Sequence, residues 1–156
     1  KPKAICAAER LSALNSEITI RTYPTRLTEE NAQEIISQYD IVVDGCDNFS
    51  TRYLINDICA EMGKVYVYGA ICGFEGQVSV FHYGEEKKSY RDLYPDEEEM
   101  RRMPPPPKGV MGITPAVTGS IEATEVLKII CGFGEVLSGK LWTIDLRTLQ
   151  SNKFSL

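Results

Sequence analysis

Four polar residues with ligand-binding chemistry lie close together in the stretch IVVDGCDNFSTRYLINDIC, residues 41–59. Asp44, Asp47 and Asn48 follow an apolar run, and Arg52 falls in the helical segment that comes next. A strand-to-helix turn of an α/β sheet commonly binds ligands, because helix N-termini and the carboxyl ends of strands meet there.

The same residues have a purely structural interpretation. Asp47 and Asn48 precede a helix, where such side chains most often accept hydrogen bonds from free backbone N–H groups, and Ser50 or Thr51 could also cap it. Arg52 could face a phosphate, but a cation at a helix N-terminus is disfavoured unless an anion is bound there. From the residues alone, helix capping is the favoured role of Asp47 and Asn48.

Two other polar residues near strand ends are predicted to be structural. Asp44 ends the apolar run, and His82 is the single histidine of the chain, at the end of an alternating segment. Cys46 is the cysteine nearest to the turn, and we interpret it as a small packing residue rather than a reactive thiol.

The elements that must position these residues follow from hydrophobic periodicity and from glycine and proline signals. We expect helices over about 1–15, 28–36, 50–62 and 114–131, and strands over 17–23, 41–43, 65–71, 78–82, 140–146 and 149–156. Alternating helices and strands predict an α/β fold with a Rossmann-like, largely parallel sheet and an antiparallel edge.

The segment from about 84 to 110 has a different character. It contains EEKK, DEEE and four consecutive prolines, 104–107. Prolines donate no backbone hydrogen bond and favour an extended conformation, so we expect an unstructured surface crossover loop.

Bulk composition bounds the class of protein. With 156 residues, 43% of them apolar, the chain can form one domain with a core. Seventeen basic against 22 acidic residues give a net charge of -5, which argues against nucleic acid as a partner. No apolar run approaches the roughly 20 residues that span a bilayer, so no membrane partner is expected. Five separated cysteines indicate a reducing, cytoplasmic location.

No glycine-rich phosphate-binding turn is present in the sequence. The G-x-G-x-x-G pattern is missing, and GFEG and GFGE have the wrong spacing. The chain also begins at Lys1, without methionine and almost inside a helix. It is therefore expected to be a fragment of a longer protein.

Four blocks of sequence carry a family resemblance: KPKAICAAERLSALNSEITI, YDIVVDGCDNFSTRYLINDIC, GKVYVYGAICGFEGQVSVF and GVMGITPAVTGSIEATEVLKIICGFG. In this order and spacing they resemble the ThiF/MoeB/HesA family of adenylating enzymes, the bacterial relatives of ubiquitin-activating enzymes. The likeness covers nearly all of the chain except the crossover loop. It implies that residues 1–156 are the C-terminal portion of a single adenylation domain, incomplete at its N-terminus.

The resemblance implies a function: ATP-dependent adenylation of the C-terminal glycine of a ubiquitin-like sulfur carrier. A ThiS-like carrier of thiamine biosynthesis is slightly favoured over a MoaD-like carrier of molybdenum cofactor biosynthesis. Lys3 would contact the phosphates, Asp47 would bind Mg²⁺, and Asn48 would line the ATP site; Lys3 and Asp47 would be catalytic. The family also implies a homodimer, and the isolated chain is expected to be inactive.

The sequence departs from the family pattern at two places. Zinc-binding members carry C-Y-R-C where this chain has Ser89-Tyr90-Arg91-Asp92, and no second C-x-x-C occurs here, so no zinc is expected. Some members also carry a reactive cysteine in the loop, where this chain has proline, at about Pro105. The chemistry is therefore expected to stop at adenylation.

Two alternatives from other classes remain open. A non-catalytic module that docks the carrier would suit the lost zinc and cysteine positions. A dinucleotide-dependent oxidoreductase would share the sheet, but no glycine fingerprint precedes any helix in this sequence.

Overall fold

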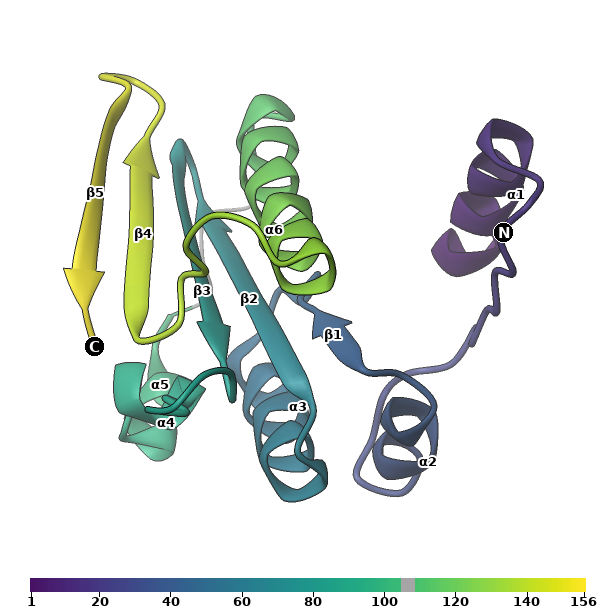
Figure 1. Ribbon diagram of the computed structural model, residues 1–156, viewed down its shortest axis with the longest axis horizontal. Helices are drawn as coiled ribbons and strands as arrows, with labels where there is room; N and C mark the ends of the chain where they lie inside the picture. The colour runs from purple at the N-terminus through teal and green to yellow at the C-terminus, as the bar shows by residue number, and fades with distance from the viewer. Residues whose placement is uncertain (105–108) are drawn as a thin grey trace.

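The computed structural model describes residues 1–104 and 109–156 as a mixed α/β structure built on a five-stranded sheet (Figure 1). The elements in chain order are α1 (Lys3–Leu14), α2 (Ala32–Ser37), β1 (Ile41–Val43), α3 (Phe49–Met62), β2 (Val65–Cys72), β3 (Glu75–Phe81), α4 (Tyr90–Leu93), α5 (Glu97–Arg102), α6 (Ile113–Cys131), β4 (Lys140–Asp145) and β5 (Gln150–Ser155). None of the helices in the described residues is both long and apolar enough to cross a bilayer.

The strands lie side by side in the order β1-β2-β3-β4-β5. β1 pairs with β2 in parallel, whereas the pairs β2-β3, β3-β4 and β4-β5 are antiparallel. The expectation of a largely parallel sheet is therefore corrected for the described residues. The physical reason lies in the connections: only two residues, Gly73 and Phe74, join β2 to β3, and such a short turn can connect only antiparallel strands.

Helices cover both faces of the sheet. Tyr66 and Tyr68 of β2 pack in one core with α3 and α4, whereas Val67 of the same strand packs in the other core with α6. This division follows from the alternation of side chains along a strand. The turn after β1 packs on the α3 side, where Cys46 lies against that core.

The N-terminal segment differs from its prediction. The helix expected at 1–15 is present as α1, which has no buried residue and stands apart from the sheet beyond β1 (Figure 1). The strand expected at 17–23 is wrong: these residues form no strand in the described structure. Apolar-polar alternation predicts a half-buried strand, but a strand also requires a hydrogen-bonded neighbour, and this segment pairs with none of the described strands.

The predicted unstructured crossover contains two short helices. Ser89 and Asp92 form a reciprocal capping box at the start of α4, and Tyr90 is fully buried in the core. Asp96 caps α5, whose first turn is acidic and whose last turn is basic, as the helix dipole favours. These local signals outweigh the polar composition. Pro105 and the rest of 105–108 lie outside the described residues.

Candidate functional site

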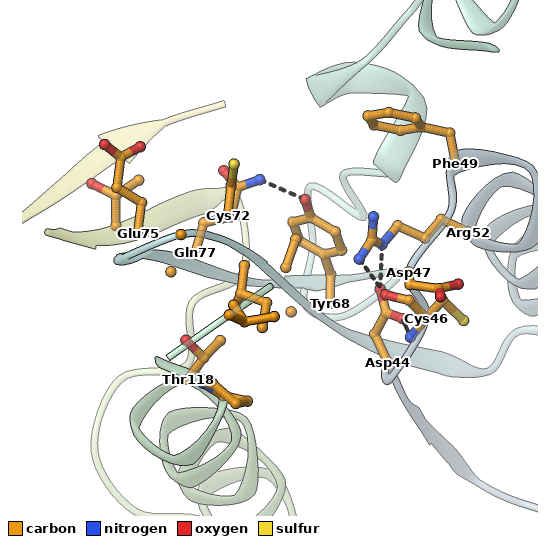
Figure 2. Close-up of a pocket in the computed structure, with 18 of the residues that line it drawn as sticks. Asp44, Cys46, Asp47, Phe49, Arg52, Tyr68, Cys72, Glu75, Gln77 and Thr118 are labelled. Atoms are coloured by element: carbon orange, nitrogen blue, oxygen red, sulfur yellow. Dashed lines mark hydrogen bonds and ion pairs between the residues drawn. The ribbon is translucent and has the colours of Figure 1, made fainter. Parts of the chain in front are cut away.

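A cleft of about 1360 Å³ opens at the carboxyl end of β1. The residues that line it lie in the turn that follows β1, in the C-terminal half of β2, in β3 and in α6 (Figure 2), and also in α5, β4 and β5. Because β1 ends after three residues and β2 continues for eight, the cleft lies beside the part of β2 that extends past β1. This is the position at which open α/β sheets bind ligands.

A buried ion pair supports the turn. Asp44 Oδ2 accepts hydrogen bonds from Arg52 Nε at 3.0 Å and from the Tyr66 hydroxyl at 2.9 Å, and Asp44 Oδ1 accepts one from Cys46 N at 2.7 Å. Asp44 and Arg52 are 7% and 8% exposed. Asp44 therefore has the structural role that its sequence position predicted.

Arg52 is occupied on several sides. Besides Asp44, it donates to Cys46 O at 2.6 Å, and its guanidinium lies 5.7 Å from the centre of the Tyr68 ring. Its strongly raised pKa reflects the attraction of Asp44, against the opposing effect of burial. The side chain lines the cleft, but its charge is largely neutralised by the carboxylate. Its main role in this structure is to fix the conformation of the turn.

Asn48, rather than Ser50 or Thr51, caps α3. Asn48 Oδ1 accepts a hydrogen bond from Thr51 N at 2.8 Å. Asp47 makes one side-chain hydrogen bond within the described residues, from Asn48 Nδ2 at 3.2 Å, and its carboxylate is exposed at the cleft. The described contacts therefore do not support capping by Asp47. The cap is Asn48, and Asp47 has oxygen atoms available to a ligand.

The other predicted residues have different surroundings. Lys3 is exposed at the start of α1 and is not among the described residues that line the cleft. The structure thus brings Asp47 and Asn48 together at the cleft and leaves Lys3 apart from them. His82, predicted to be structural, has its Nε2 3.0 Å from Asn56 Oδ1, and burial lowers its pKa.

Cys46 lies at the cleft with a poorly ionised thiol. Burial, followed by the nearby Asp44 carboxylate, raises its pKa to about 12. A thiol reacts as the thiolate, so these surroundings disfavour nucleophilic chemistry at Cys46. This agrees with its interpretation as a small packing residue.

Two residues that the sequence interpretation missed lie on α6. Thr118 and Glu122 are buried, line the cleft, and carry an oxygen atom, Oγ1 and Oε1 respectively, with no hydrogen-bond partner among the described residues. Figure 2 shows Thr118 projecting from α6 toward the strands. The signal that could have found them is a polar stripe of positions at helical spacing, which consists of Thr114, Thr118, Glu122 and Glu125.

Glycines let α6 approach the sheet at these two positions. A β carbon at Gly69 would lie 2.3 Å from Glu122 Cδ, and one at Gly76 would lie 2.2 Å from Thr118 Oγ1. A side chain at either strand position would therefore require the Glu122 or Thr118 side chain to move. Burial, followed by the nearby Asp44 carboxylate, raises the pKa of Glu122 to about 7, while Arg52 acts in the opposite direction.

Substituting Glu122 should change how stability depends on pH. The folded chain keeps a proton on Glu122 up to about pH 7, whereas the unfolded chain releases it near the ordinary value of 4.5. The free energy of unfolding should therefore fall as pH rises through this window. Glu122→Gln should remove that fall and make the chain more stable at pH 8 by about 1–2 kcal/mol, a value reduced by water in the open cleft.

Urea unfolding of both proteins at pH 5 and pH 8 measures this effect. An equal difference between the two proteins at both pH values would contradict a perturbed Glu122. Glu135→Gln is the matched control, because Glu135 is exposed and lies outside the cleft.

Comparison with known proteins places the chain in a family. Residues 1–156 match the ThiF family. The chain is 47% identical over 157 residues to a sulfur carrier protein adenylyltransferase of Thermus thermophilus. This alignment covers 93% of this chain and 55% of the relative. It is 44% identical over 156 residues to a probable molybdopterin-synthase adenylyltransferase of Pyropia yezoensis. This alignment covers 99% of this chain and 41% of the relative.

The fold matches solved structures as well. The crystal structure of E. coli MccB with ATP superposes with a TM-score of 0.79 at 19% identity, over 99% of this chain and 48% of that chain. At this identity the match shows the fold alone, and it confirms the expected adenylation-type α/β architecture. The chain spans about half the length of the curated relatives it matches. On these findings, this chain belongs to the ThiF family.

Proposed function

We propose that this chain is part of an enzyme that uses ATP to adenylate the C-terminal glycine of a ubiquitin-like sulfur carrier protein. The printed names of its relatives, a sulfur carrier protein adenylyltransferase and a probable molybdopterin-synthase adenylyltransferase, support this activity. The complex of the structural neighbour MccB with ATP supports ATP as the nucleotide. Because the chain spans about half of each relative, the activity is proposed for the longer parent enzyme.

The observation that carries the proposal is the position of Asp47. Its carboxylate is exposed at the cleft, directly before α3, while Asn48 takes over the capping of that helix. No group of three or more potential metal ligands occurs in the described residues. One carboxylate fits Mg²⁺ in a nucleotide site, because this ion keeps several waters and takes its other ligands from the phosphates.

The chain's own residues would then act as follows. Asp47 would hold the magnesium ion, and Asn48 would line the nucleotide site while its side chain fixes the start of α3. The Asp44–Arg52 pair would keep the turn rigid, so that the Asp47 carboxylate stays in position. Lys3 would contact the phosphates. Bound Mg²⁺-ATP supplies an activated α-phosphorus and a pyrophosphate leaving group.

We prefer a ThiS-like carrier slightly over a MoaD-like one. The alternative to an enzyme is a non-catalytic module that docks the carrier. The enzyme is proposed to be a cytoplasmic homodimer that uses ATP and Mg²⁺ but no zinc, and residues 1–156 are proposed to be the C-terminal portion of its adenylation domain. Ser89 and Asp92, at the positions of the family's first zinc-binding pair, are engaged in the capping box of α4.

Pyrophosphate exchange into ATP tests the function directly. The parent enzyme should catalyse exchange when it is given a carrier ending in Gly-Gly, and it should lose exchange when the final glycine of that carrier is deleted. A ThiS-like and a MoaD-like carrier tested in parallel decide which route the enzyme serves. Binding of a carrier without any exchange would instead support the docking module and refute the enzyme.

A further inference from the structure

The edge of β2 that faces the cleft lacks a neighbouring strand. β1 pairs with β2 only up to Val43 opposite Val67, and Asp44 N donates to Val67 O at 2.9 Å. Beyond that point no described strand pairs with β2 on this side. Backbone groups of alternate residues face the same edge, so Gly69 and Ile71 direct their N–H and C=O groups toward the opening. Both residues line the cleft.

Glu122 lies against this same stretch of β2. Its carboxyl group occupies the place where a side chain of Gly69 would be, and it is 7% exposed. Among the described residues its Oε1 has no hydrogen-bond partner. A buried polar atom without a partner lowers stability, and a leucine of similar size would avoid that cost. The cleft therefore combines an unsatisfied carboxyl group with an unsatisfied strand edge.

The charges around Glu122 favour a neutral ligand over an anionic one. Asp44, in the turn after β1, is the acidic neighbour, and Arg52 of α3, the basic neighbour, is already paired with Asp44. A phosphate beside Glu122 would gain little from Arg52, because that side chain is already bound to Asp44. A peptide main chain is uncharged and offers both donors and acceptors, and extended peptides bind free sheet edges by adding a strand.

We propose that Glu122 and the β2 edge at Gly69 and Ile71 bind the main chain of an extended peptide, the C-terminal tail of the carrier protein. This inference rests on the proposed function and adds specificity-determining residues to it. The Glu122 carboxyl fills the α6 side of this edge, so a tail residue beside it has no room for a side chain there. That restriction selects glycine, the residue with which the proposed carriers end.

Substitution of Glu122 in the parent enzyme tests the assignment. Glu122→Leu should raise KM for the carrier about tenfold, the effect of one net hydrogen bond, and leave KM for ATP within twofold. Its thermal stability should be unchanged or higher, because an orphaned polar group is removed. Glu122→Gln keeps a hydrogen-bonding group of the same shape, so KM for the carrier should stay within about threefold of the unmodified enzyme.

A pH profile adds a readout that a purely structural role would not affect. Burial places the pKa of Glu122 at about 7, so KM for the carrier should vary between pH 6 and pH 8 in the unmodified enzyme. Glu122→Gln should flatten this profile because an amide does not titrate in this range. A profile that is the same in both proteins would overturn the assignment.

Glu125→Gln is the matched control. Glu125 is a buried glutamate of the same helix, but it bonds to Leu137 N at 2.8 Å and to Lys128 Nζ at 2.6 Å, and it does not line the cleft. This variant should lose stability and keep both KM values.

The possible results distinguish failure of the tail-binding role from failure of the proposed function. If Glu122→Leu leaves KM for the carrier unchanged, or raises KM for ATP instead, the tail-binding role is wrong while the adenylation activity stands. If the unmodified parent enzyme shows no exchange with either carrier, the proposed function fails and the role of Glu122 in tail binding fails with it.

Discussion

The parent enzyme with Asp47→Ala should lose pyrophosphate exchange by at least about 1000-fold. In the proposed site this carboxylate would hold the metal, which would contribute several kcal/mol of charge stabilisation. The neighbouring residues offer no replacement, because Asn48 is engaged as the cap and Asp44 is paired with Arg52. Exchange should be measured over a range of Mg²⁺ concentrations, because a weakened metal site requires more of the ion.

Asp40→Ala is the matched control for this experiment. Asp40 is also exposed and lies near β1, but it is outside the cleft, so its removal should leave exchange unchanged. If Asp47→Ala kept normal exchange at low Mg²⁺, the metal role would be refuted. The family assignment, which rests on the whole sequence, would be unaffected.

The chain with Asp44→Ala should be less stable by about 3–5 kcal/mol. The substitution leaves Arg52 charged and buried without its partner, and it removes the acceptor of the Tyr66 hydroxyl and of Cys46 N. Such a loss is a large fraction of the net stability of a domain. Urea unfolding, followed by far-ultraviolet circular dichroism, measures it.

A double-mutant cycle separates the ion pair from the other contacts of Asp44. Asp44→Ala combined with Arg52→Met should cost clearly less than the sum of the two single variants, because the second substitution removes the stranded charge. Additive costs would show that the pair contributes little and that the Tyr66 and Cys46 contacts dominate. Glu98→Ala, at an exposed ion pair of α5, should change stability by less than about 1 kcal/mol.

The sequence predicted the central elements well where local signals and tertiary structure agree. The apolar run at 41–43, the helix that Gly63 ends, and the closing pair of strands all appear in the structure. Gly63 has a φ of 63°, which suits a glycine at the end of a helix. Asp47 and Asn48 lie in one turn at the cleft, and the structure assigns the helix cap to Asn48, a role that the sequence leaves open between the two residues.

The failures have a common physical cause. Strand pairing at 17–23 depends on a neighbour that local alternation does not reveal. On α6, the apolar residues Leu127 and Ile130 are 53% and 67% exposed in the described structure, whereas the polar residues Thr118 and Glu122 are buried. Which helix face is covered depends on tertiary contacts, and close approach to Gly69 and Gly76 favours the polar stripe.

The two cores on opposite faces of the sheet differ in their aromatic residues, and this has an optical consequence. Trp142, the single tryptophan of the chain, packs against the core that α6 covers. Tyr53, Tyr66, Tyr68 and Tyr90 lie in the core that α3 covers. Tryptophan fluorescence therefore reports on one layer and near-ultraviolet tyrosine signals report mainly on the other, so loosening of either layer can be observed without labels.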